Sequence, residues 1–316
     1  MLDLKRAVRP AQKFRDPDVT AKGERRARVA LGRLATLWVN TGTLCNLTCA
    51  GCYIESSPRN DRLVYITATE VAAYLDEIER DRLGTEEVGF TGGEPFMNPD
   101  FIAMLEDALG RGFRALVLTN AMRPMMRCAD GLVALRERHG DRLVLRVSID
   151  HYTKTRHQLE RGARSWDPMI KGVRWLIENG FAVHVAGRTR WQEDEASLRE
   201  GYRRLFAELG LAVDADDRRE LVLFPEMDEK ADVPEITEAC WGLLHVEPAA
   251  MMCASSRMVV KRKGAARPAV VACTLLPYDP QFELGATLAE ARGIVRLNHP
   301  HCAEFCVLGG GSCSKA

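Results

Sequence analysis

Residues 37–53 read LWVNTGTLCNLTCAGCY, a short apolar segment followed at once by a loop that carries three cysteines. The apolar segment, residues 37–40, predicts a β-strand. Cys45, Cys49 and Cys52 follow it in a C-x3-C-x2-C arrangement. In α/β barrels the reactive groups lie on loops after the carboxyl ends of the strands. We therefore expect this loop to carry chemistry.

Three thiols on one loop are typical of metal ligands. In a reducing compartment, clustered cysteines bind metal or do chemistry more often than they form disulfides. A four-iron cluster held by three cysteines keeps one iron open to a substrate or cofactor. A structural zinc ion takes four protein ligands, and no obvious fourth ligand lies near residues 45–52. The triad thus favours a catalytic iron–sulfur cluster.

Strand and helix patterns alternate along the chain up to residue 224. A capping-box sequence at residues 67–70 opens one helix, and Gly84 follows its end. Strands recur about every 28 to 38 residues, as in βαβ units that build a parallel sheet. Five further strands are predicted, at residues 88–90, 115–120, 144–149, 182–188 and 220–224. Six units predict an α/β fold, a partial (β/α)6 TIM-like barrel.

The pattern changes after residue 225, where short segments with cysteines and glycines replace the repeat. We expect a basic N-terminal arm over residues 1–36, the barrel over 37–232 and a small cysteine-rich α+β extension over 233–316. The arm holds ten Lys and Arg residues against four acidic ones. This composition favours a solvated segment, with contact to RNA as the alternative.

Charge and hydropathy exclude several classes of protein. The 316 residues include 44 Lys and Arg and 44 Asp and Glu, so no overall field attracts nucleic acid or an anionic membrane. No apolar stretch approaches the ~20 residues that cross a bilayer, and the first thirty residues lack the apolar core of a signal peptide. We expect a cytoplasmic protein with no membrane partner, and the charge balance disfavours a nucleic acid partner.

The cysteine loop resembles the signature of the radical S-adenosylmethionine enzymes, C-x3-C-x-aromatic-C. Gly51 stands where the family has an aromatic residue, and Tyr53 follows the last cysteine instead. Thr91-Gly92-Gly93-Glu94-Pro95 resembles the family's GGEP segment. The resemblance implies a [4Fe-4S] cluster on the three cysteines, S-adenosylmethionine beside it, a contact from Tyr53, and a methionine ammonium group held by Glu94 and the glycine backbone.

Later strand ends carry further positions similar to those of the family. The resemblance implies ribose and carboxylate contacts from Asn120, Ser148 and Asp150, although Asn120 and Asp150 could each serve as caps. The stretch His157 to Arg161 resembles an H-x3-RG run. Arg188, at the end of the fifth strand, is the candidate for the methionine carboxylate, with a surface salt bridge as the alternative. No catalytic residue is assigned.

Six cysteines lie beyond residue 239, and their spacing partly resembles the twitch or SPASM extensions of the same family. The resemblance implies one auxiliary [4Fe-4S] cluster. Its four ligands would come from five cysteines: Cys253, Cys273, Cys302, Cys306 and Cys313. A structural zinc site in the same cysteines is the alternative. Cys128 stands alone and is expected to be a small buried hydrophobe.

The resemblance implies an enzyme that reductively cleaves S-adenosylmethionine to a 5'-deoxyadenosyl radical and abstracts a hydrogen atom from its substrate. The auxiliary cluster would assist a net oxidation, and a flavodoxin or ferredoxin would supply the electron. Residues 1–36 are too short for the peptide-binding domain that peptide-modifying members often carry, so we expect a small-molecule substrate. Maturation of a ribosomal peptide is the alternative. A non-catalytic protein that binds metal or RNA is a more remote alternative.

Overall fold

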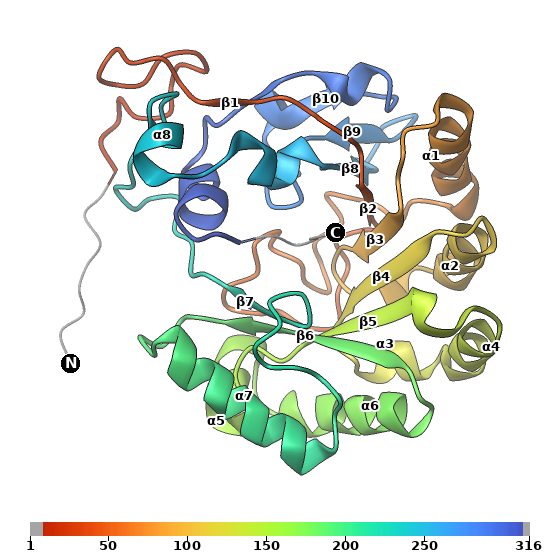
Figure 1. Ribbon diagram of the computed structural model, residues 1–316. Helices are drawn as coiled ribbons and strands as arrows, with labels where there is room; N and C mark the ends of the chain where they lie inside the picture. The colour runs from red at the N-terminus through yellow and green to blue at the C-terminus, as the bar shows by residue number, and fades with distance from the viewer. Residues whose placement is uncertain (1–8, 312–316) are drawn as a thin grey trace.

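Six parallel strands form the main part of the sheet in the computed structural model, which describes residues 9–311. Each strand from β2 to β7 lies beside the next one in the chain (Figure 1). The α/β fold with a parallel sheet is therefore confirmed. The strands are β2 Thr36–Asn40, β3 Glu87–Thr91, β4 Arg114–Thr119, β5 Leu143–Ser148, β6 Ala182–Arg188 and β7 Leu221–Phe224.

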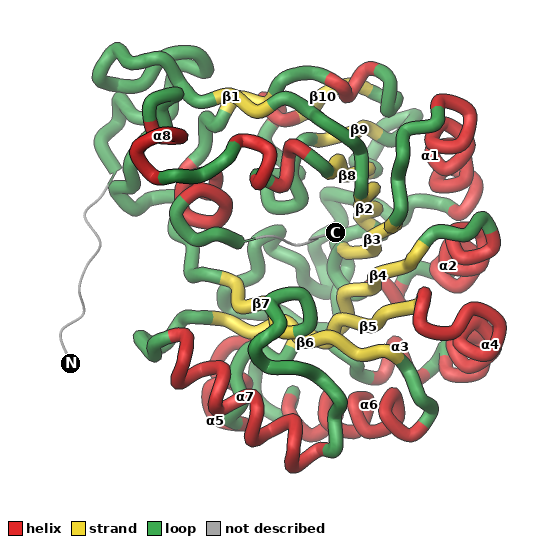
Figure 2. The backbone as a smooth tube through the Cα atoms, in the orientation of Figure 1, coloured by secondary structure: helices red, strands yellow, loops and turns green. Residues whose placement is uncertain are grey.

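Helices connect these strands and cover the outer face of the sheet, while loops gather on the side that faces the C-terminal region (Figure 2). The capping box predicted at residues 67–70 is formed, because Thr67 Oγ1 accepts from the Glu70 amide at 3.2 Å and Glu70 Oε2 accepts from the Thr67 amide at 3.0 Å. The helices are α1 Ala68–Asp81, α2 Phe101–Gly110, α3 Arg123–Met126, α4 Ala129–His139, α5 Lys154–Arg161, α6 Trp166–Glu178 and α7 Glu195–Leu209.

The C-terminal region continues the same sheet. Strand β8 (Ser256–Val260) lies parallel to β2. Strand β9 (Ala269–Val271) pairs antiparallel with β8, and β10 (Glu283–Gly285) pairs antiparallel with β9. A short helix, α8 (Cys240–Leu244), precedes these strands, and a single turn of π-helix spans Cys302–Val307. The inner face of the barrel and this region therefore share one apolar cluster, which includes Trp38, Phe224 and Phe305.

The described part of the N-terminal segment packs onto the C-terminal region. Strand β1 (Arg28–Val29) pairs antiparallel with β11 (Val295–Arg296). Arg26 is fully buried, and its Nη2 donates to Glu235 Oε1 at 2.7 Å. Arg15, Lys22 and Arg33 are exposed, as in a solvated segment. Lys13, Arg25 and Arg26 instead meet carboxylates far along the chain, which local composition does not show.

No helix among residues 9–311 is long and apolar enough to cross a membrane.

Candidate active site

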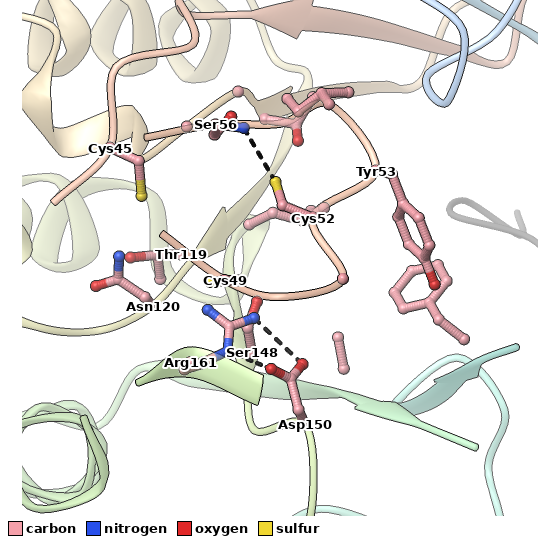
Figure 3. Close-up of a pocket in the computed structure, with 18 of the residues that line it drawn as sticks. Cys45, Cys49, Cys52, Tyr53, Ser56, Thr119, Asn120, Ser148, Asp150 and Arg161 are labelled. Atoms are coloured by element: carbon pink, nitrogen blue, oxygen red, sulfur yellow. Dashed lines mark hydrogen bonds and ion pairs between the residues drawn. The ribbon is translucent and has the colours of Figure 1, made fainter. Parts of the chain in front are cut away.

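A cavity opens at the carboxyl ends of the parallel strands, and nearly all of the predicted barrel positions line it (Figure 3). The cysteine loop forms one wall, and the ends of β3 to β6 form others. Ten predicted residues share this cavity: Cys45, Cys49, Cys52, Tyr53, Gly92, Gly93, Asn120, Ser148, Asp150 and Arg188. Glu94 is the predicted residue that does not line it. Positions up to 143 residues apart in the sequence thus meet in one place.

Burial acts on the thiols of Cys45 and Cys49, and backbone amides contact the sulfurs of Cys45 and Cys52. Burial raises the pKa of Cys45 to about 12 and also raises the pKa of Cys49. The Leu47 amide donates to Cys45 Sγ at 3.4 Å, and the Ser56 amide donates to Cys52 Sγ at 3.2 Å. Buried thiols with amide donors fit a metal cluster, because a bound metal deprotonates the sulfur and amide hydrogen bonds stabilise the resulting charge.

The contacts around Gly51 explain why a glycine stands where the family signature has an aromatic residue. Its amide donates to Glu160 Oε1 at 2.6 Å, and its carbonyl accepts from Arg188 Nη1 at 3.1 Å. A Cβ at this position would lie 2.6 Å from Glu160 Oε1 and 2.7 Å from Arg188 Nη2. The two charged side chains therefore occupy the space that an aromatic residue would need. Neither sequence spacing nor composition pointed to Glu160.

Arg188 and Tyr53 lie together on the same wall. The Arg188 guanidinium carbon stands 4.4 Å from the centroid of the Tyr53 ring, a distance within the range of a cation–π contact. The Tyr53 hydroxyl donates to the Pro225 carbonyl at 2.9 Å. Arg188 is buried, so the alternative of an exposed surface salt bridge is wrong. Its Nε has no hydrogen-bond partner among the described residues, which fits a ligand contact.

The two glycines of the GGEP segment allow it to dock on the chain just before Cys45. The Gly93 amide donates to the Gly42 carbonyl at 2.8 Å, and the Glu94 amide donates to the Leu44 carbonyl at 3.2 Å. A Cβ on Gly93 would lie 2.1 Å from the Leu44 carbonyl oxygen. Gly92 has a φ of +140°, which other residues rarely adopt. The glycines thus hold the second strand end against the cysteine loop.

Glu94 lies behind the cavity wall and is 2% exposed. Its Oε1 accepts from Thr119 Oγ1 at 2.7 Å, and its Oε2 accepts from the Asn120 amide at 2.9 Å. Burial raises the pKa of this carboxyl to about 7, although those hydrogen bonds act in the opposite direction. In turn, Asn120 Nδ2 donates to Asn46 Oδ1 at 2.9 Å. In this structure Glu94 positions Asn120, which positions the cysteine loop.

A largely buried ion pair forms the floor below Cys49 (Figure 3). Arg161 Nε donates to Asp150 Oδ2 at 2.5 Å, and its Nη2 donates to Asp150 Oδ1 at 3.2 Å. His157, on the same helix α5, is fully buried outside the cavity lining and packs edge-on to Trp166 at 5.3 Å between ring centroids. Burial lowers the pKa of His157 to about 4. The neutral imidazole therefore acts as part of the packing around the ion pair.

Four of the five predicted auxiliary cysteines line a second, apolar cavity in the C-terminal region. They are Cys253, Cys273, Cys302 and Cys306, and Met252, Leu276 and Phe282 are among their neighbours. Burial raises the pKa of Cys253 to about 12 and of Cys273 to about 11. Cys313 lies outside the described residues. Cys240 does not line this cavity, and the Thr237 amide donates to its sulfur at 3.3 Å.

The donor sets fit thiolate-bound clusters. No three His, Cys, Asp or Glu side chains in the described ranges converge tightly enough to hold a single metal ion. A four-iron cluster instead distributes its cysteine ligands over separate irons, so its thiols surround a volume. Three thiols around the first cavity and four around the second match that requirement.

Residues 39–189 match the family model described as the Radical SAM superfamily. Mycofactocin maturase MftC of Mycobacterium tuberculosis is 28% identical over 164 residues, covering 50% of this chain and 40% of MftC. The subtilosin biosynthesis protein AlbA of Bacillus subtilis is 29% identical over 143 residues, covering 45% of this chain and 30% of AlbA. The GTP 3',8-cyclase of Rhodococcus opacus is 37% identical over 119 residues, covering 37% of this chain and 32% of the cyclase. The chain thus matches less than half the length of each relative.

Solved structures show the same fold. SuiB of Streptococcus suis bound to S-adenosylmethionine superposes with a TM-score of 0.58 at 12% identity, covering 80% of this chain and 63% of SuiB. Residues 39–189 are therefore similar to the radical SAM superfamily, and the likeness to SuiB shows the shared fold.

Proposed function

We propose that the protein binds a [4Fe-4S] cluster and S-adenosylmethionine in the barrel cavity and oxidises a substrate by hydrogen-atom abstraction. The observation that carries this proposal is the meeting of three cysteine thiols with the GGEP segment and Arg188 around one cavity. Bound together, the reduced cluster and S-adenosylmethionine supply a 5'-deoxyadenosyl radical that takes hydrogen from the substrate.

The chain's own residues have distinct roles in this proposal. Cys45, Cys49 and Cys52 hold the cluster, and the backbone at Gly92 and Gly93 borders the methionine part of the cofactor. Arg188, buried with one donor free, pairs with the methionine carboxylate by a charge-assisted hydrogen bond. Asn120, Ser148 and Asp150, which line the same cavity, contact the ribose, and Tyr53 borders the cofactor beside Arg188. Glu94 supports the site from behind instead of contacting the ammonium group directly.

We propose one auxiliary [4Fe-4S] cluster on Cys253, Cys273, Cys302 and Cys306, in a twitch- or SPASM-like extension over residues 233–316. Four thiolates occupy all four irons, so such a cluster supplies an electron acceptor and leaves no iron open for substrate. The cavity around these thiols is apolar and enclosed by the C-terminal region. A zinc ion on the same cysteines is distinguished by metal analysis of the purified protein.

For the substrate we favour a peptide. The names of AlbA, a bacteriocin biosynthesis protein, and of the structure of SuiB with the precursor peptide SuiA point in this direction. A small molecule, the expectation from the sequence, is the second candidate, and the similarity to a GTP 3',8-cyclase favours it.

The test is formation of 5'-deoxyadenosine from S-adenosylmethionine by anaerobically reconstituted protein under dithionite, measured by chromatography. We expect product from the wild type, none from Cys45→Ala, and wild-type amounts from the matched control Cys128→Ala, whose thiol lines neither cysteine cavity. Product formation that survives in Cys45→Ala would overturn the proposal.

A further inference from the structure

Five apolar side chains are among the residues that line the active-site cavity. We define the apolar chamber as Trp38 of β2, Leu118 of β4, Ala186 of β6, Phe224 of β7 and Leu275 of the C-terminal region, all of which line the cavity. Trp38, Ala186, Phe224 and Leu275 are each at most 9% exposed. All five belong to, or pack against, one apolar cluster. Four different strands and the C-terminal region therefore converge to make an apolar surface.

Three of the four charged residues along the same cavity, within residues 9–311, are already in ion pairs. Asp150 is bound to Arg161, and Glu160 is bound to Arg190. Among the lining residues that the structure describes, Arg188 is the cation without a carboxylate partner, and the proposed function assigns it to the cofactor's carboxylate. A charged substrate group entering the chamber would thus lose its hydration without gaining a counter-charge, which is strongly unfavourable.

Leu275 connects the chamber to the second cavity, because it lines both. Its amide donates to Cys273 Sγ at 3.4 Å. Leu275 therefore borders both the chamber and the cavity of the auxiliary thiols.

We propose that the part of the substrate that reacts is an uncharged hydrocarbon side chain of a peptide, held in the apolar chamber against Leu275. This inference rests on the proposed function, because it takes the cofactor to occupy the charged wall. The chamber excludes phosphates, ammonium groups and carboxylates from the reacting position. The peptide carrying the side chain remains at the mouth of the cavity.

The experiment measures binding of three peptides to the full chain, reconstituted anaerobically with S-adenosylmethionine. The probes are heptapeptides of six glycines with leucine, lysine or glutamate at the centre, and saturation-transfer NMR titrations give their dissociation constants. Burial of a leucine side chain is expected to strengthen binding by about tenfold to 100-fold. The lysine and glutamate peptides should therefore bind at least about tenfold more weakly than the leucine peptide.

Two substitutions in the chamber and one matched control sharpen the test. Ala186→Glu should remove the preference for leucine, whereas Ala207→Glu, on the exposed face of α7, should keep it. If Ala186→Glu does not fold, Ala186→Leu fills the chamber without adding a charge. Ala186→Leu should weaken binding of the leucine peptide, while binding of an additional peptide with alanine at the centre should be unaffected.

Equal or tighter binding of a charged peptide would overturn the inference, and so would displacement of the leucine peptide by GTP or an absence of leucine-peptide binding. In each of these cases continued formation of 5'-deoxyadenosine would leave the proposed function standing. Loss of that product in the wild type would instead refute the proposed function.

Discussion

Replacement of Glu94 by glutamine tests whether this carboxyl is buried as a support for the cysteine loop. Burial raises its pKa from the ordinary value of 4.5 to about 7. Between these two values the folded state holds the proton more tightly than the unfolded state, so stability falls as the pH rises. The difference corresponds to about 3 kcal/mol, fully expressed above pH 7. Glutamine keeps the shape of the side chain and carries no charge.

The assay is urea unfolding of wild type and Glu94→Gln under anaerobic conditions at a series of pH values from 4 to 8. We expect the free energy of unfolding of the variant, relative to wild type, to rise by about 3 kcal/mol between pH 4.5 and pH 7. Glu200→Gln, on the exposed side of α7, should give curves parallel to wild type. Parallel curves for Glu94→Gln would instead mean that the Glu94 carboxylate is equally stable in the folded and unfolded states, contrary to the supporting role of this side chain.

Three further substitutions test individual contacts. Gly51→Phe introduces the family's aromatic residue. It should lower the melting temperature and the iron content, because its Cβ meets Glu160 and Arg188. The control Ala50→Phe, at an exposed position of the same loop, should leave the melting temperature and the iron content unchanged. Asp150→Asn should destabilise the protein by about 3–5 kcal/mol in chemical unfolding, since it leaves the Arg161 charge buried and unpaired, and a loss below 1 kcal/mol would contradict this. Gly93→Ala should reduce iron binding after reconstitution, measured by colorimetric iron analysis, because its Cβ displaces the backbone before Cys45; iron retained at the wild-type level would count against the docking argument.

The barrel could be predicted from the sequence because its signals are local. The strand at residues 37–40 and the capping box at residues 67–70 depend on residues close together in the chain. The fold then places the carboxyl ends of parallel strands at one edge of the sheet. Asn120, Ser148 and Arg188 therefore face the cavity that Cys45 also lines.

The remaining features depend on contacts between distant residues. The pairing of Arg26 with Glu235 joins positions 209 residues apart, so the basic composition of the N-terminal segment pointed to solvent instead. Glu160 clamps Gly51 from a helix 109 residues later, and no local pattern indicates this contact. The need for glycine in the GGEP segment likewise could not be predicted locally, because the close neighbours of Gly92 and Gly93, at residues 41–44, follow another strand.

The C-terminal cysteine site could be predicted only in part from the sequence. Their number indicated a metal site, but spacing alone could not show which of them meet. The structure brings Cys253, Cys273, Cys302 and Cys306 around one cavity and places Cys240 elsewhere. Strand pairing of β8 with β2 and β9 with β8 brings these segments together, and such pairings are set by tertiary packing.

Cys45, Cys49 and Cys52 by themselves should hold a four-iron cluster with one open iron. The most direct measurement is electron paramagnetic resonance of a variant with serine at Cys253, Cys273, Cys302, Cys306 and Cys313, reconstituted without oxygen and reduced with dithionite. We expect about four irons per chain and a signal that changes when S-adenosylmethionine is added. An absence of any iron-based signal, or a signal that the cofactor leaves unchanged, would contradict this expectation.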